Sequence, residues 1–588
     1  MYNTRIIMAI FHTEPQRVAS AKYSVTNTRW EITPPVEHPP VEMHPALAQV
    51  LAARGVLGAE AMDAFLNADL SRLADPLLLP EMETAVNAVL ETLARGGRIR
   101  IFGDYDADGI TATALLVRAL GALHPADGAV DWYLPHRIDD GYGLNTQSLD
   151  EARASGVELG ITVDNGITAH AQLEHAQRIG LRMIVTDHHE PDGALPPAVA
   201  VLNPKRHDSA YPFRELAGVG VAYLLLSAVC TARGLPASAP AKFLDLVTIG
   251  TVADIAPLTG ENRILVRQGL SLLTPTNKKA GLAALLRAIN VKERASCGDV
   301  GFQIGPRLNA AGRVAHAESA LRLLLTNDRS EAESLAAQLS AHNTQRQEEE
   351  LRTLEQVLEM VNARDLTREK VLVLASPDWH PGVIGIVASR IVERYHRPCA
   401  LIAVQDGIGK GSARARAPFH LWEALESCSG LLTRFGGHRV AAGFEVEEKN
   451  IVPLREALGA IGDRVLSDDD LLPSLTIDAL LELPEVTTDF ARRIQALEPF
   501  GMGNPTPVFA ATDVVVQHCT RRGGDGAHLG MSLRAAGGNR TIPAIWFRHG
   551  ECADRIHPGD HVDIAFNAGL NTWQEVTSAQ LVVKDVMV

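Results

Sequence analysis

One turn of the chain reads Gly103-Asp104-Tyr105-Asp106-Ala107-Asp108-Gly109. It follows a short apolar run that predicts a strand at Arg98–Phe102, and it precedes a helix-like run at 110–120. Three carboxylates therefore occupy alternate positions of one strand-to-helix turn. Carboxylates this close repel one another and raise one another's pKa, so the cluster is stable only beside a cation. Ligation by oxygen favours hard ions such as Mg²⁺ or Mn²⁺.

The spacing of these aspartates also matches the opening of an EF-hand calcium loop, which requires a Glu at its twelfth position. Counted from Asp104, that position is Leu115, an apolar residue inside the expected helix. The EF-hand is therefore excluded. A solvated acidic turn without any ion is the alternative that this motif alone leaves open.

Length and composition indicate a multidomain globular chain. Its 588 residues predict roughly three or four domains. No apolar run reaches the ~20 residues of a membrane span, and the N-terminal stretch lacks the pattern of a signal peptide. The six cysteines are scattered without a C-x-x-C pair, so we expect no zinc site, no disulfide framework and a reducing, cytoplasmic compartment. The net charge of −15 means that any nucleic acid must be bound in a locally positive groove.

Strands and helices alternate between residues 80 and 260. Helix-like runs at 146–155 and 169–179 separate strand candidates at Arg98–Phe102, 129–134, 159–163, 183–186 and 199–203. This alternation predicts a parallel sheet with helices on both faces. In such sheets the ligand lies at the carboxyl ends of the strands.

Polar residues follow four of these strand candidates. The ends read Asp104 to Asp108, then Pro135-His136-Arg137, Asp164-Asn165-Gly166 and Asp187-His188-His189. A further carboxylate, Asp254, lies among apolar residues, where it is unlikely to be buried unless paired or bound to metal. One histidine with four or more aspartates suits two hard cations, which in two-metal sites lie roughly 3.5–4 Å apart. Because side chains alternate along a strand, His188 and His189 should not both face one metal.

The order Asp-Tyr-Asp-Ala-Asp-Gly, Asp-Asn-Gly, Asp-His-His and Ala-Asp resembles the four metal-binding motifs of the DHH phosphoesterase superfamily. The segment 436–443 resembles the glycine-rich signature of the second domain of that superfamily. The segments 133–137, 141–144 and 305–313 resemble its RecJ branch. The resemblance covers about 75 to 588.

The resemblance implies a set of metal ligands and catalytic residues: Asp106, Asp108, Asp164, His188 and Asp254. It implies that Asp164 bridges two divalent cations, Mn²⁺ or Mg²⁺, and that His189 faces the scissile phosphate. Asp104 is expected either to bind a cation directly or to contact a residue that does. The segments that carry the resemblance, with the basic stretch described next, contain the expected substrate-binding residues Arg137, Arg307, Asn309, Arg313, Ser412, Arg414, Gly437 and His438.

A second alternating unit follows a long polar stretch that predicts one connecting helix or a helix pair at 331–339 and 345–361. Within this unit, the stretch 409–416 places small residues between basic ones. Small residues let a phosphate approach the backbone while Arg binds it bidentately. We expect the substrate backbone, and the terminal 5′ phosphate, at this loop and at Gly436-Gly437-His438.

The last 120 or so residues change character. Five short strands at 508–517, 528–534, 541–547, 561–567 and 580–586 predict a small barrel of the OB type. A basic groove with stacking faces for a single strand could come from Arg521, Arg522, Arg534, Arg540, Arg548, Trp546, Phe547 and Trp573. The alternative is that the aromatic residues form the barrel core.

The expected fold class is α/β: a parallel-sheet DHH domain and a smaller α/β DHHA1-type domain joined by a long helix, followed by an OB-like barrel. The expected boundaries are an appendage at 1–75, the DHH domain at 76–314, the helix at 315–365, the DHHA1-type domain at 366–465 and the OB domain at 466–588.

The resemblance implies a single-stranded-DNA-specific 5′→3′ exonuclease of DNA repair and recombination that releases 5′-mononucleotides by a two-metal mechanism. It also implies a monomer without membrane attachment that works with single-strand-binding protein and a repair helicase. Two alternatives are kept. One is a phosphodiesterase of small substrates such as oligonucleotides, cyclic dinucleotides or pyrophosphate, and the other is a non-catalytic DNA-binding scaffold.

Overall fold

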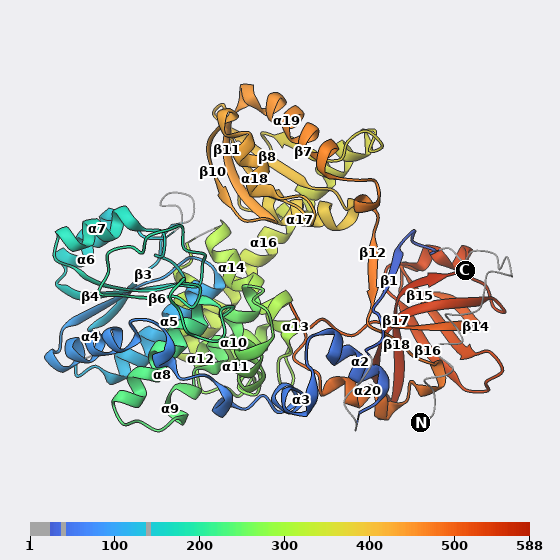
Figure 1. Ribbon diagram of the computed structural model, residues 1–588, viewed down its shortest axis with the longest axis horizontal. Coiled ribbons are helices and arrows are strands. Elements are labelled where there is room, and N and C mark those ends of the chain that lie inside the picture. Colours follow the sequence, from blue (N-terminus) through green and yellow to red (C-terminus); the bar gives the residue numbers. More distant parts are fainter. Residues whose placement is uncertain (1–23, 37–42, 127, 137–142, 315) are drawn as a thin grey trace. The chain divides into compact units, whose positions relative to one another are not determined.

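The first sheet of the computed structural model has five parallel strands in the order β3-β2-β4-β5-β6 (Figure 1). The structure describes residues 24–36, 43–126, 128–136, 143–314 and 316–588. The strands are β2 (Arg98–Phe102), β3 (Val130–Tyr133), β4 (Val157–Val163), β5 (Arg182–Thr186) and β6 (Ala200–Leu202). The parallel sheet predicted from the alternating pattern is thereby confirmed.

Helices cover both faces of this sheet. Ile99 and Ile101 of β2 are buried on the face covered by α4 (Met82–Arg95), α5 (Ala107–Leu123) and α8 (Gly218–Ala232). Phe102 points to the other face, where it packs in the cluster formed with α6 (Thr146–Ala154) and α7 (His170–Arg178). This arrangement follows from the alternation of side chains along a strand.

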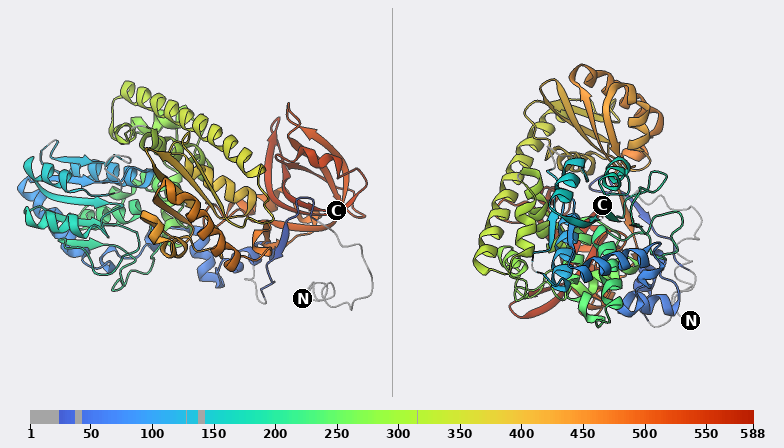
Figure 2. Two further views of the ribbon diagram at one scale, coloured as in Figure 1. Left: turned by 90° about the horizontal axis from the view of Figure 1, so that it is seen from above. Right: turned by 90° about the vertical axis from the view of Figure 1, so that its left-hand side faces the viewer.

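The connecting segment is one continuous helix. After α15 (Glu318–Leu325), α16 runs over Arg329–Asn362, 34 residues, which is about 51 Å at 1.5 Å per residue. Its first part packs on α12 (Ala280–Ala288) and α14 (Gly305–Val314), and it also contacts α17 (Ile384–Tyr395). Figure 2 shows it in yellow-green without a break. Of the two sequence-based options, the single helix is the correct one.

The second sheet has the order β10-β11-β9-β8-β7. Its strands are β7 (Leu372–Ser376), β8 (Cys399–Gln405), β9 (Ile408–Arg414), β10 (Leu432–Gly437) and β11 (Ala441–Glu447), and only β7 and β8 are parallel. The basic stretch expected to be a loop is therefore mostly strand β9. Pairing on both sides, with β8 and β11, overrides the local preference of its glycines.

These elements, residues 56–471 and 497–506, form one compact unit, and the remaining described residues form another. In the second unit, a closed barrel is built from β14 (Phe509–Arg522), β15 (His528–Ala535), β16 (Thr541–Trp546), β18 (Val576–Met587) and β17 (His561–Trp573). The OB-type barrel is confirmed, although β14, β17 and β18 are longer than predicted.

The segment 1–75, expected to be one appendage, is divided between the two compact units. Strand β1 (Arg29–Ile32) pairs in parallel with β12 (Ser474–Ile477), and residues up to Gly55 belong to the barrel unit. Residues from Val56 onward belong to the unit that carries the parallel sheet. The described helices include none long and apolar enough to cross a membrane.

The barrel uses its aromatic residues in two ways. Trp546 is 2% exposed and belongs to the core, as the core alternative required. Trp573, at the end of β17, is 74% exposed, and Phe547 is half exposed. Three of the arginines expected in a groove bond to nearby groups: Arg521 pairs with Asp554, and Arg534 and Arg540 donate to backbone carbonyls.

Candidate metal centre

The carboxyl ends of three neighbouring strands carry the acidic residues of the site. Strand β2 leads into Asp104 and Asp106, β4 into Asp164, and β5 into Asp187. Asp254 joins them from the C-terminal end of α10 (Leu244–Ala253). A cavity of about 350 Å³ opens here, lined by Asp104, Tyr105, Asp106, Ala107, Asp108, Ala253, Asp254, Ile255, Asn309 and Arg313.

Two aspartates of the acidic turn are fixed by helix N-termini. Asp106 Oδ1 accepts hydrogen bonds from the N–H groups of Asp108 (3.0 Å) and Gly109 (3.1 Å), and so caps α5. The oxygens of buried Asp108 accept from the N–H groups of Gly218 (2.7 Å) and Val219 (2.9 Å) at the start of α8. A Cβ at Gly109 would lie 2.6 Å from the backbone of Asp104, so the turn needs glycine there.

Asp164 lies at the centre of the cluster. It is 3% exposed and has a φ of +62°, a left-handed conformation that Asp adopts more easily than most residues. The Nε2 atom of His188 is 3.1 Å from Asp164 Oδ1 and 3.8 Å from Asp254 Oδ2. His188 therefore faces the carboxylates of two different elements of the cluster.

His189 has a different partner. Its Nδ1 atom is 2.7 Å from Asp187 Oδ1, which also accepts from the N–H groups of His188 and His189. The other oxygen of Asp187 accepts from the N–H of Ile167 at 2.9 Å. The two histidines are therefore oriented toward different carboxylates, as the alternation along a strand predicts.

The two histidines are held in opposite charge states. Burial, with the charge of His189, lowers the pKa of His188 to about 3, so His188 is a neutral imidazole suited to bind metal. Burial would also lower the pKa of His189, but the hydrogen bond and charge of Asp187 raise it to about 9. His189 is thus a cation at neutral pH.

The carboxylates repel one another in a buried environment. Burial and the charge of Asp106 raise the pKa of Asp108 to about 7. Burial and the charge of Asp108 raise the pKa values of Asp164 and Asp254 well above the ordinary value. Such a cluster loses this repulsion when divalent cations bind.

The donor set fits two hard cations. Asp104, Asp106 and Asp164 form one group whose ligating atoms all lie within 4.8 Å of one another. A second such group contains Asp108, His188 and Asp254, and a third contains Asp164, His188 and His189. Since His189 is held as a cation by Asp187, the first two groups are the better ligand sets.

The second sheet carries the residues expected to bind the 5′ phosphate. Arg414 Nη1 donates to Ser412 Oγ at 3.1 Å, and a Cβ at Gly385 would lie 2.8 Å from that oxygen. His438 follows Gly437 in the turn between β10 and β11. Burial and the positive charges of His189 and Lys205 lower the pKa of His438.

Of the three residues of the segment 305–313 that are expected to bind substrate, two line the acidic cavity. Asn309 lines the acidic cavity and accepts a hydrogen bond from the Ala107 N–H at 2.7 Å. Arg313 also lines it and donates to the carbonyl of Gly382 at 2.9 Å. Arg307 is not among the residues that line this cavity; it bonds to the carbonyl of Gln303 and to Ser340 of α16. Arg137 lies outside the described residues.

Two residues of the site were given no role from the sequence. Asp187 orients His189, and its place directly after a predicted strand, in the Asp-His-His motif, was the available signal. Ile255 is 65% exposed beside Asp254 and has a φ of +60°. No sequence pattern indicates that conformation for a β-branched residue.

Comparison with known proteins adds three family matches and close relatives. Residues 98–251 match the DHH family, N-terminal domain, residues 368–461 the DHHA1 domain, and residues 477–585 the RecJ OB domain. The single-stranded-DNA-specific exonuclease RecJ of Escherichia coli is 35% identical over 93% of this chain and 96% of its own length. That of Thermus thermophilus is 40% identical over 83% of this chain and 71% of its own.

A solved structure extends the likeness to the fold. The crystal structure of RecJ in complex with Mn²⁺ from Thermus thermophilus has a TM-score of 0.81 at 35% identity, covering 95% of this chain and 79% of that one. A parallel sheet with these aspartates and histidines at its carboxyl edge, followed by a DHHA1 domain, defines a DHH phosphoesterase. Within that class the chain belongs to the RecJ family.

Proposed function

We propose that this chain is a metal-dependent exonuclease that degrades single-stranded DNA from its 5′ end and releases 5′-mononucleotides. The observation that carries the proposal is the complete donor set around Asp164 in a chain of the RecJ family. The relatives are named single-stranded-DNA-specific exonucleases, and solved RecJ structures hold Mn²⁺ or Mg²⁺.

Two divalent cations are the proposed cofactors. Asp104, Asp106 and Asp164 would hold one, while Asp108, His188 and Asp254 would hold the other. When bound, such a pair lowers the pKa of a water molecule and neutralises charge on the reacting phosphate. Asp164 lies near both sets, which supports a bridging position for it.

The chain's own groups would bind and orient the scissile phosphate. His189 is a cation whose Nδ1 is held by Asp187, so both ring nitrogens carry a proton, and its positive charge would attract the oxygens of the scissile phosphate. On the second sheet, Ser412, Arg414, Gly437 and His438 are the proposed site of the 5′ phosphate. Asn309 and Arg313 would contact the strand at the edge of the acidic cavity.

The biological setting is proposed from the family. It comprises repair and recombination in the cytoplasm by a monomer, with single-strand-binding protein and a repair helicase as partners. We also propose the domain division at 75, 314, 365 and 465, with the reservation that residues up to Gly55 belong to the barrel unit. A small-substrate phosphodiesterase is less favoured, because such an enzyme has no need of the OB domain matched at 477–585.

The test is an oligonucleotide labelled at either end, incubated with Mn²⁺ beside a blunt duplex of the same sequence. Early release of labelled mononucleotide from the 5′ end of the single strand alone is expected. Asp164→Asn keeps the shape of the side chain and tolerates φ +62°, so it should stay folded while hydrolysis falls to background. Asp192→Asn, an exposed change, is the matched control. Near-normal hydrolysis by folded Asp164→Asn would contradict the ligand assignment.

A further inference from the structure

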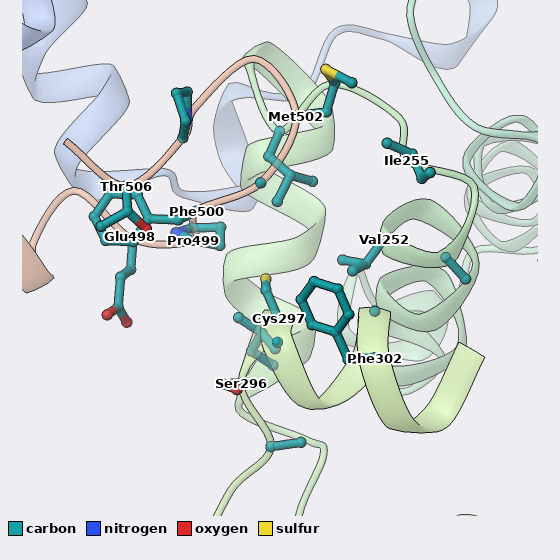
Figure 3. Close-up of a pocket in the computed structure, with 18 of the residues that line it drawn as sticks. Val252, Ile255, Ser296, Cys297, Phe302, Glu498, Pro499, Phe500, Met502 and Thr506 are labelled. Atoms are coloured by element: carbon teal, nitrogen blue, oxygen red, sulfur yellow. The ribbon is translucent and has the colours of Figure 1, made fainter. Parts of the chain in front are cut away.

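An apolar cavity of about 730 Å³ adjoins the acidic cavity, and Ala253 and Ile255 line both. Its other walls come from the end of α10, from the segment 294–302, and from the loop at 497–506, all within one compact unit. Figure 3 shows the Phe302 ring near Val252 and Cys297, with Met502 and Ile255 on neighbouring segments.

Three large apolar side chains of this cavity are exposed. Phe302 is 84% exposed, Ile255 65% and Met502 56%. Single exposed apolar residues are ordinary, but a cluster of them around a cavity indicates a binding site. Side chains with this much exposed surface contribute little to the core. Packing therefore does not explain why the three residues are apolar.

The backbone at this cavity is irregular at two points. Ile255 has a φ of +60°, which is a costly conformation for a β-branched residue. The adjoining loop is nevertheless fixed, because the Leu258 N–H donates to the Met502 carbonyl at 2.7 Å. Phe302 lies on a π-helical turn, Val300–Ile304, a form that is frequent at functional sites. Both irregularities present apolar side chains to the same cavity, and Ile255 directly follows the metal ligand Asp254.

The charges of the cavity indicate what kind of group it binds. Among the described residues that line it, the charged ones are Arg294 and Glu498, which have opposite signs. In Figure 3 the carboxylate of Glu498 points away from Phe302. The surface is thus suited to a flat, uncharged group rather than to a phosphate. A nucleobase is such a group, and unpaired bases stack on aromatic side chains whatever their sequence.

We propose that this cavity is a base pocket, which binds unpaired nucleobases of the DNA strand on the 3′ side of the scissile phosphate. Phe302 is its stacking face, and Ile255 separates it from the acidic cavity. The inference rests on the proposed exonuclease function and names a specificity-determining surface for it.

The side of the strand follows from the positions of the two lobes. The proposed 5′-phosphate residues, including Arg414 and His438, come from the second sheet, whereas the residues that line the base pocket come from 252–302 and 497–506. Because Ala253 and Ile255 line both cavities, a strand with its 5′ nucleotide at the second sheet and its scissile phosphate in the acidic cavity would continue past Ile255 into the pocket. Bases already paired in a duplex cannot stack on Phe302, so the pocket also favours single strands.

The experiment moves a single abasic residue one nucleotide at a time along a 5′-phosphorylated oligo(dT) and measures kcat and KM with Mn²⁺. In the wild type, one or two registers near the 5′ end should raise KM by about 5- to 150-fold, the range that loss of one stacked base gives. Phe302→Ala should raise KM for intact DNA by a similar factor, change kcat little, and abolish the dependence on register.

Three variants complete the design. Phe302→Trp should restore both the low KM and the register dependence, which a merely structural role would not do. Leu351→Ala, a half-exposed position on α16, should match the wild type. If Phe302→Ala does not fold, Met502→Ala takes its place. It should also raise KM and weaken the register dependence, by a smaller factor than Phe302→Ala.

The outcomes separate the two proposals. A wild type that does not hydrolyse intact oligo(dT) contradicts the exonuclease function itself. A wild type that hydrolyses it, with a KM and register profile unchanged by Phe302→Ala, overturns the base pocket alone. The apolar cavity would then be a candidate surface for a protein partner.

Discussion

The contacts of Arg263 allow a quantitative prediction of how strongly the loop at 497–506 is held to the unit that contains the parallel sheet. Its side chain is 2% exposed on α11 (Gly260–Leu270). Nε donates to the Phe65 carbonyl (2.9 Å), Nη1 to the Leu497 carbonyl (2.9 Å) and Nη2 to the Glu498 carbonyl (2.8 Å). The guanidinium also stacks 3.6 Å from the centre of the Phe65 ring. One buried cation thus joins three separate segments of the same unit.

The cost of removing this side chain can be estimated from its contacts. The carbonyl of Leu497 also accepts from Asn504 Nδ2 at 3.0 Å, so it keeps one bond in Arg263→Ala. Each carbonyl that loses its donor in the interior costs about 1–3 kcal/mol. The cation–π contact adds about 1 kcal/mol. For the carbonyls of Phe65 and Glu498 together with the stacking, the sum is about 3–7 kcal/mol of local stability.

Hydrogen exchange measured by mass spectrometry is the suitable assay, because a chain of several domains need not unfold in two states. Peptides covering 497–506 should exchange at least about 100-fold faster in Arg263→Ala, since 1.4 kcal/mol corresponds to a factor of ten and the lower end of the estimate is about 3 kcal/mol. Arg263→Lys should lie between the two, because one ammonium cannot donate in three directions. Arg329→Ala, 80% exposed at its side chain, is the control. A change below about fivefold in Arg263→Ala would refute the reasoning.

Three further predictions concern the metal centre and the barrel. Asp187→Asn should lower kcat by about 10- to 100-fold with a smaller effect on KM, because His189 loses the carboxylate that orients and charges it; steady-state kinetics with Mn²⁺ checks this. EDTA should lower the melting temperature more at pH 8 than at pH 6. Carboxyl groups with a raised folded-state pKa, such as Asp108 at about 7, bind more protons folded than unfolded, so the metal-free fold loses stability as pH rises through that pKa. Trp573→Ala should weaken binding of a fluorescent oligonucleotide in EDTA by about 5- to 150-fold if its exposed ring stacks on a base, and an unchanged Kd would exclude that role.

The sequence predicted those parts of the site that local pattern determines. The strand at Arg98–Phe102 was predicted at its observed bounds, because its apolar residues and the following Asp106 cap are encoded within a dozen positions. The convergence of Asp164 and Asp187 on the same edge follows from parallel topology, which the alternating pattern indicates. Side-chain alternation predicted that His188 and His189 would not both face one metal, but it did not indicate which of them would.

The parts that were missed depend on contacts between distant segments. Asp108 is fixed by amides of Gly218 and Val219, more than 100 positions away, which no local pattern shows. Arg307, which is predicted to contact substrate, donates to Ser340 of α16, a partner 33 positions away that no local pattern shows. Strand β1 pairs with β12, whose residues lie some 440 positions later, so an N-terminal boundary at 75 could not reveal it.

The acidity of the chain and the polyanionic nature of DNA are compatible because of how charge is distributed around Asp164. Asp104, Asp108 and Asp164 are buried there, and the raised pKa values of Asp108, Asp164 and Asp254 indicate that these carboxylates cannot all be ionised without cations. Bound cations would convert the most repulsive part of the cleft into one that attracts phosphate, beside the charged His189. Metal binding and DNA binding at the scissile phosphate should therefore be coupled, so that strand affinity at this cleft rises with Mn²⁺ while affinity at the barrel does not. In a chain with a net charge of −15, the bound cations would therefore supply positive charge for binding the substrate as well as for the reaction.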